Sequence, residues 1–280
     1  MSRRRNADKP AKQRDVFVAR PFAGRVDETE WVALREIVPA ATAPLRLRSS
    51  DVPVTLSTVL PLHWPGMVTR SGTRFLGLQV GSRSGDASRD LAFVLDKVLD
   101  AEPGSSVVPP ELPGPGPRLQ DLLDDAPLEV TVHAGFEYWV EGEEDTTGEM
   151  AESMERANAS VVPTARVAGV PSAYWCRMRE RSHLRWVLPE DEDPLLDALA
   201  RLSVQGALPL GAETRFVGSF RAHGLLVPVW DLPLDMEATD LETPAAEFRA
   251  RLDEALTGGP LSSDERRARA GLLNRQLTLR

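Results

Sequence analysis

Residues 81–89 form the segment whose residue types best fit the binding of a small anion. The segment reads Gly-Ser-Arg-Ser-Gly-Asp-Ala-Ser-Arg and lies between a predicted strand and a predicted helix. A glycine-containing loop at a helix N-terminus exposes backbone N–H groups and the positive end of the helix dipole, so it can hold a phosphate or a carboxylate. The candidate ligand-binding residues are Arg83, Ser84, Gly85, Ser88 and Arg89.

The same segment also fits a purely structural role, in which Ser84, Asp86 or Ser88 caps the following helix and the glycines permit the turn. A carboxylate at the anion position would repel the ligand, which favours the capping interpretation. The segment matches neither the GxxxxGK[ST] phosphate loop, the GxGxxG dinucleotide loop nor the GxSxG nucleophile elbow. Both interpretations remain open at the level of sequence.

A second candidate site is a predicted β-hairpin at residues 173–188, in which basic residues alternate with others. If the basic faces of its two strands coincide, the hairpin carries a cationic patch that could meet an acidic partner or a phosphate. The alternative is an ordinary solvated face, with the arginines neutralised by the acidic run at 190–193. The alternating residues are Arg177, Arg179, Arg181, His183 and Arg185, of which Arg177, Arg179 and Arg185 are the predicted partner-binding residues.

The third candidate is the N-terminal arm, residues 1–14, which has no apolar periodicity and is predicted to be disordered. Its six basic residues stand against a single acidic one, whereas the whole chain carries a net charge of −9. A basic tail of this kind can contact RNA by releasing counterions, although a dispensable solubilising tail would look the same. The basic residues of the arm are Arg3, Arg4, Arg5, Lys9, Lys12 and Arg14.

No other group of residues predicts catalysis or metal binding. The single cysteine, Cys176, excludes a disulfide framework and a multi-cysteine zinc site. Cys176 with His183 as its base would be a nucleophile pair, but a cysteine on a strand is more typical of a small core residue. The four acids at 190–193 suit a helix N-terminus better than a metal ion. We therefore expect no catalytic residues, no metal ligands and no cofactor.

Composition places the protein among ordinary globular proteins. The chain has 280 residues, of which 42% are hydrophobic and 27% charged, so it can bury a substantial core. Its most apolar run, residues 225–230, is far shorter than the roughly 20 residues of a membrane helix. No stretch resembles a signal peptide. These features predict a cytoplasmic protein that does not contact a membrane.

The periodicity of apolar residues predicts alternating helices and strands. Helices are expected at 28–38, from 86 or 88 onwards, around 119–123, near 150–157, from 193, from 243 and from 262 or 263. Strands are expected at 52–60, 74–80, 128–132, 136–140, within 173–188, at 216–220 and at 225–230. The final residues, 274–280, alternate in polarity and predict an edge strand.

The order of these elements suggests that the second half repeats the first. Residues 37–41 resemble 161–165, residues 59–61 resemble 187–189, and a predicted hairpin around His133 resembles one around His223. The fold class is therefore predicted as α+β, with two similar α-β-β-α-β-β halves, which an internal duplication would explain, plus C-terminal helices and a disordered basic N-terminal arm. A generic α+β pattern can imitate such a repeat. The predicted divisions are an arm at 1–15, a first half at 16–140 with a proline-rich loop at 102–118, a second half at 141–235 and a C-terminal helical segment at 236–280.

Three segments of the chain, residues 84–92, 185–193 and 264–280, are specific enough to support a resemblance. Together they resemble an uncharacterised actinobacterial family of unknown function, whose members sometimes carry translocase- or topoisomerase-related labels. The resemblance spans nearly the whole chain and implies an actinobacterial, cytosolic origin. It implies no activity, and the sequence has no nucleotide-binding motif of a translocase motor.

These observations favour a non-catalytic binding or adaptor protein over an enzyme. Its expected partner is a protein or a ribonucleoprotein, with a possible RNA contact through residues 1–14. The alternative is an enzyme or sensor that binds a small phosphorylated or carboxylated ligand at residues 81–89.

Overall fold

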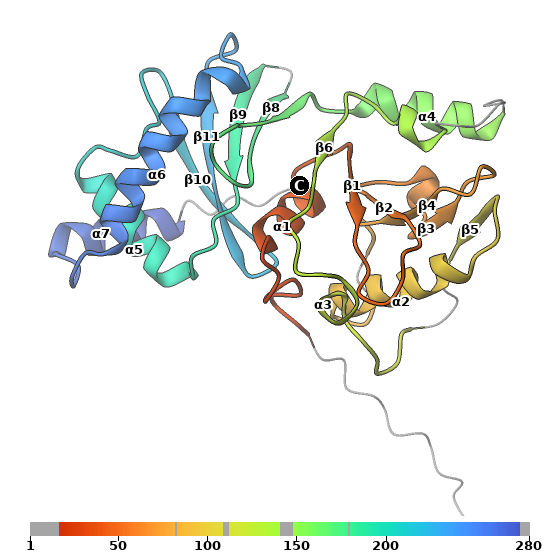
Figure 1. Cartoon of the computed structure of the whole chain (residues 1–280). Helices are drawn as coiled ribbons and strands as arrows, with labels where there is room; N and C mark the ends of the chain where they lie inside the picture. Colours follow the sequence, from red (N-terminus) through yellow and green to blue (C-terminus); the bar gives the residue numbers. More distant parts are fainter. Residues whose placement is uncertain (1–16, 82, 109–111, 141–147, 179, 275–280) are drawn as a thin grey trace, which may run out of the picture.

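The computed structural model describes residues 17–81, 83–108, 112–140, 148–178 and 180–274. It confirms the predicted α+β class, because the described chain forms two β-sheets with helices packed against them (Figure 1). The predicted basic arm at 1–14 and Arg179 lie outside these ranges. Of the edge strand predicted at 274–280, residues 275–280 also lie outside them, and Asn274 is the last residue of a helix. None of the described helices is long and apolar enough to cross a membrane.

The first sheet has six strands in the order β5-β3-β4-β2-β1-β6. Its neighbouring strands are antiparallel except for β2 and β4, which run parallel. The elements of this part are α1 (Glu28–Glu36), β1 (Ala41–Leu45), β2 (Val54–Ser57), η1 (Pro61–His63), β3 (Gly66–Val68), β4 (Arg74–Gly77), α2 (Ala87–Asp100), β5 (Ser105–Val107), α3 (Leu119–Leu122), β6 (Thr131–Val132) and η2 (Glu137–Trp139).

The second sheet has five strands, all antiparallel, in the order β10-β11-β9-β8-β7. Its elements are α4 (Glu149–Ser160), β7 (Thr164–Arg166), β8 (Ala173–Met178), β9 (Arg181–Trp186), α5 (Glu192–Val204), β10 (Arg215–Ala222), β11 (Leu225–Leu232), η3 (Ala238–Leu241), α6 (Glu242–Leu256) and α7 (Ser263–Asn274). The two hairpins predicted in this half are confirmed as β8–β9 and β10–β11.

Helix α2 shows why the strongest sequence patterns succeeded. The Asp86 carboxylate accepts hydrogen bonds from the backbone N–H groups of Ser88 and Arg89, so Asp86 is the N-cap among the three candidates of the sequence. Leu91 and Leu95 are fully buried, as one apolar stripe on this helix requires. Local capping and helical periodicity agree here with the tertiary packing.

The prediction of a β-hairpin around His133 is wrong. Only Thr131 and Val132 pair with β1, and the segment that follows is the 3-10 helix η2. The 3-10 turn buries Phe136, Tyr138 and Trp139 in one cluster, with the rings of Phe136 and Trp139 stacked at 4.4 Å. An extended strand would have pointed consecutive rings to opposite faces of the sheet, so burial of all three favours the turn.

The two sheets therefore differ in their strand pairing. The first contains a parallel pair and the second contains none among its described strands. Because the first-half hairpin of the proposed repeat is absent, the internal duplication stays a hypothesis based on sequence order alone.

Helix α1 lies between the two sheets (Figure 1). Trp31, Val32 and Leu34 of this helix belong to one core cluster with apolar residues of β1 and β2 and with Phe220 and Val227 of the second sheet. The opposite face of the second sheet packs on α5, α6 and α7 in a separate cluster. The first sheet and one face of the second thus share a core through α1.

Candidate functional site

The predicted anion loop at residues 81–89 is satisfied by carboxylates of the protein itself. Asp90 accepts hydrogen bonds from the backbone N–H groups of Arg83, at 2.7 Å, and Ser84, at 3.2 Å. Asp86 accepts those of Ser88 and Arg89, as its capping role requires. Because these two carboxylates take the N–H groups that an anion would need, the arrangement favours the capping interpretation of the loop.

The side chains of the loop also make contacts within the protein. Arg89 donates to the carbonyl oxygens of Gly114 and Pro117, at 2.9 and 3.3 Å, and its guanidinium lies over the Phe93 ring. The buried Ser88 hydroxyl donates to Gln120 at 2.6 Å. These bonds attach the loop to the end of the proline-rich region and to α3 directly after it. Ligand binding at residues 81–89 stays a prediction.

The register of the β8–β9 hairpin corrects the predicted cationic face. Arg177 pairs with Ser182, whereas His183 pairs with Cys176, so Arg177 lies on the opposite face from His183 and Arg185. Arg177 forms an ion pair with Glu237 at 2.5 Å and lies over the Trp175 ring. The sequence could not show this, because alternation gives the faces of one strand but not its register with the next.

A basic surface nevertheless forms on the face that carries His183. We define the arginine cluster as Arg166, Arg181, Arg185 and Arg215. They come from β7, β9 and β10, and cross-strand register places them on one face of the five-stranded sheet. The Arg181 and Arg215 side chains are 61% and 67% exposed, and that of Arg166 is 44% exposed. These guanidinium groups therefore remain accessible to a partner.

One carboxylate organises this surface. Asp231 of β11 forms ion pairs with Arg215 and with Arg181, the latter at 2.9 Å, and lies 3.1 Å from Nδ1 of His183. Burial would raise the pKa of Asp231, but the Arg215 hydrogen bond and the charges of His183 and Arg181 lower it overall. The single negative charge of Asp231 thus holds the Arg181 and Arg215 guanidinium groups in place, and it cannot neutralise both of them.

The charge of His183 is expected to affect stability near neutral pH. Burial lowers the pKa of His183 below its usual 6.5, and the charges of Arg185 and Arg181 add to this, while Asp231 opposes it. The unfolded chain therefore binds the proton more readily, so folding stability should fall as the pH drops below about 6.5. Between pH 7.5 and 5.5 the melting temperature of the native protein should fall further than that of His183→Gln. The exposed His63→Gln is the control, and an equal fall in all three proteins would contradict the prediction.

The alternative interpretation supposed that the acidic run at 190–193 neutralises the hairpin arginines. The structure shows other partners for these acids. The four carboxylates of the run form ion pairs with arginines from four other segments. These pairs are Glu190 with Arg249, Asp191 with Arg20, Glu192 with Arg221 and Asp193 with Arg269. The described residues contain no group of three or more side chains suited to hold a metal ion.

Cys176 has the environment of a core residue. Its side chain is buried, and burial raises the pKa of its thiol, which disfavours the thiolate needed for nucleophilic attack. His183 is its cross-strand neighbour, but the imidazole Nδ1 lies against Asp231.

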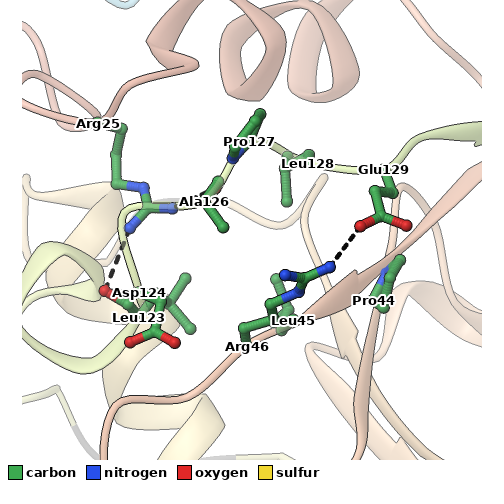
Figure 2. Close-up of a pocket in the computed structure, with 10 residues that line it drawn as sticks. All are labelled: Arg25, Pro44, Leu45, Arg46, Leu123, Asp124, Ala126, Pro127, Leu128 and Glu129. Atoms are coloured by element: carbon green, nitrogen blue, oxygen red, sulfur yellow. Dashed lines mark hydrogen bonds and ion pairs between the residues drawn. The ribbon is translucent and has the colours of Figure 1, made fainter.

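A hollow at the end of β1 is too small to bind a ligand (Figure 2). Its volume is about 10 Å³, which suits a single water molecule. Arg25 donates to the Leu123 carbonyl oxygen at one side, and the Arg46–Glu129 ion pair closes the other, as Figure 2 shows. This hollow is therefore part of the packing between β1 and the segment after α3.

Sequence reasoning found Arg185 and pointed to Arg181, but it missed Arg166, Arg215 and Asp231. These three come from strands far apart in the chain, so only the strand order brings them together. Arg215 directly precedes a predicted strand, which was the one local signal available for it.

The two sheets, the shared helix and the arginine cluster define a two-sheet α+β protein with a basic surface on one sheet. Residues 21–280 match the model of a family described as a family of unknown function (DUF5926), and the chain belongs to that family. This match confirms the resemblance to a family of unknown function. Neither the curated proteins nor the solved structures contain a match to the chain.

Proposed function

We propose that this protein is a cytoplasmic RNA-binding or adaptor protein that contacts phosphate groups through the arginine cluster. The observation that carries the proposal is the placement of Arg166, Arg181, Arg185 and Arg215 on one face of the second sheet, where Asp231 pairs with the exposed Arg181 and Arg215. The basic arm at 1–14 is the expected second contact. Both regions are positive although the chain as a whole carries a charge of −9.

Two features favour phosphate over an acidic protein partner. The cluster consists of arginines, whose planar guanidinium groups bind phosphate oxygens in pairs. Its groups are spread along a rigid sheet face, where neighbouring strands lie about 4.8 Å apart, so several phosphates of one strand can be reached together. The strong negative charge of the rest of the protein limits non-specific attraction to nucleic acid, so binding should depend on this surface.

The cluster lacks the means to distinguish bases. The aromatic residues on this face, Tyr174 and Phe220, are buried in the core cluster that includes α1. RNA-binding surfaces that select a sequence generally stack exposed aromatic rings on bases. We therefore expect sequence-independent binding through the phosphate backbone, with a strong dependence on salt.

The test compares two triple variants of the full chain that each remove three positive charges. Arg181→Ala, Arg185→Ala and Arg215→Ala remove the cluster, whereas Arg46→Ala, Arg221→Ala and Arg267→Ala remove exposed arginines elsewhere. Binding of a fluorescent 12-nucleotide oligouridylate is measured by anisotropy at several salt concentrations. The cluster variant should bind roughly 10-fold more weakly at low salt, and its salt slope should be about 2 lower, because about three phosphate contacts are lost.

Equal binding by the native protein and both variants, or no binding at all, would overturn the proposal. Equal losses in both variants would show that net charge alone governs binding. Stronger binding of a poly-glutamate peptide than of RNA would assign an acidic protein partner instead. If the arm is the second contact, deletion of residues 1–14 should weaken RNA binding further. Inorganic phosphate tests the ligand site at residues 81–89 separately. A rise in the melting temperature of the cluster variant with phosphate would favour that site.

A further inference from the structure

The first sheet has one face that is only partly covered. Its other face packs on α1 and α2, through residues such as Leu56 and Leu76. On the partly covered face, η2 and α4 pack over Leu60 and Met67 and leave the neighbouring part of the sheet open. A cavity of about 310 Å³ lies over that open part, within the range of small-ligand sites.

The lining of this cavity is polar but carries few charges. Its eight described lining residues include no carboxylate, ammonium or guanidinium group, although 27% of the chain is charged. Three threonines line it, one from each of β1 and β2 and one directly before β4. Their hydroxyl groups can each donate and accept hydrogen bonds. The lining residues that carry hydroxyl groups or rings are Thr42, Thr55, Thr73, Phe75, His133 and Tyr138.

Three rings form the remaining wall, and two of them are fixed by hydrogen bonds. The rings of His133 and Tyr138 lie with centroids 4.6 Å apart, and Phe75 lies 6.4 Å from Tyr138. His133 Nε2 is hydrogen-bonded to the Thr42 hydroxyl at 2.8 Å, and the Tyr138 hydroxyl to Ser57 at 3.2 Å. Burial raises the pKa of Tyr138, so its phenol is neutral.

This composition indicates the chemistry of an occupant. A phosphate or carboxylate would find no guanidinium or ammonium partner among the lining residues, so an anion is disfavoured. A planar ring packs well on aromatic side chains, and ring amide and carbonyl groups match hydroxyls that both donate and accept.

We propose that this cavity binds an uncharged planar heterocycle, the base of a free nucleoside, with Thr55 as a hydrogen-bonding residue and the rings of Phe75, His133 and Tyr138 as the wall. The site is separate from the arginine cluster, which lies on the second sheet. The proposal therefore does not depend on RNA binding by that cluster.

The test is a titration of the full-length protein with uridine and adenosine, followed by ligand-observed NMR, with glucose as the comparison compound. Thr55→Val removes one hydroxyl while keeping the β-branched shape, and Thr164→Val makes the same change on the second sheet. Thr55→Val should weaken nucleoside binding about 5-fold, the effect of one neutral hydrogen bond, and Thr164→Val should leave it unchanged. Thr55→Phe fills the cavity and should abolish binding.

Three outcomes would overturn the proposal. They are an absence of nucleoside binding to the native protein, tighter binding of glucose than of either nucleoside, and unchanged binding by Thr55→Phe. Circular dichroism of both Thr55 variants establishes that they are folded. If Thr55→Phe fails to fold, Thr55→Val against Thr164→Val still decides the question.

Discussion

Replacement of Trp31 by alanine should lower the free energy of unfolding by about 3–5 kcal/mol and destabilise both sheets together. The Trp31 side chain is fully buried on α1, where its ring stacks on Phe22 at a centroid distance of 5.5 Å. Its core cluster contains strand residues from both sheets. A cavity at this position therefore removes packing from both parts of the molecule, and the denaturation curve should keep a single transition.

The measurement is chemical denaturation of the native protein and Trp31→Ala, combined with hydrogen exchange of sheet amides. Protection should fall together at Leu56 in the first sheet and at Val227 in the second. Trp64→Ala is the matched control, because Trp64 is only partly buried and packs on the separate aromatic cluster beside η2. Loss of protection confined to the first sheet would show that the two sheets unfold independently.

The second large effect is expected at Glu30, the buried carboxylate that joins α1 to the second sheet. Only 4% of this residue is exposed. Glu30 accepts hydrogen bonds from the Tyr174 hydroxyl and, at 2.7 Å, from the Ser172 hydroxyl, and Arg166 lies 3.8 Å away. Burial and the negative charge of Glu30 raise the pKa of Tyr174, so the phenol stays protonated and donates.

Glu30→Ala should lower the free energy of unfolding by about 3 kcal/mol, since two hydrogen bonds to a charged group are lost and the buried Tyr174 hydroxyl loses its partner, whereas the Ser172 hydroxyl keeps Thr29 at 2.8 Å. Tyr174→Phe should cost less, about 1.5–3 kcal/mol, because Ser172 still donates to Glu30. The two changes should be coupled in a double-mutant cycle measured by urea denaturation. Glu36→Ala, on the same helix but partly exposed, is the control with an expected loss below about 1 kcal/mol. Additive effects of Glu30→Ala and Tyr174→Phe would contradict a direct interaction.

The elements that the sequence predicted well are those whose pattern is set locally. Helix α2 has a capping residue and a continuous apolar stripe, and the hairpins β8–β9 and β10–β11 have alternating strands joined by short turns. The failure at Phe136–Trp139 has a tertiary cause. Three aromatic rings in that segment find a shared cluster only in a turn, and nothing in the local pattern shows that the cluster exists.

The candidate site was harder to predict than the fold, for a related reason. Arg177 and Arg185 are equally basic and lie in the same hairpin, yet register places them on opposite faces. Asp231 and Arg215 join the site only because β11 lies next to β9, and β10 next to β11. Residue types can indicate a basic surface, but the membership of that surface depends on strand order, which a single sequence does not reveal.

The position of α1 between the sheets has a consequence for how the protein is made. Arg35 on this helix hydrogen-bonds to His223, a partner 188 residues further along the chain. At roughly 5–20 residues per second, a ribosome needs about 10–40 s to synthesise that interval. During this time the side of α1 that will face Phe220 and Val227 has no native partner, and a chain that stops before β11 never acquires one. Synthesis through β11 is thus a condition for closing the shared core, and premature termination before this strand should leave an apolar helix face open to chaperones or to aggregation.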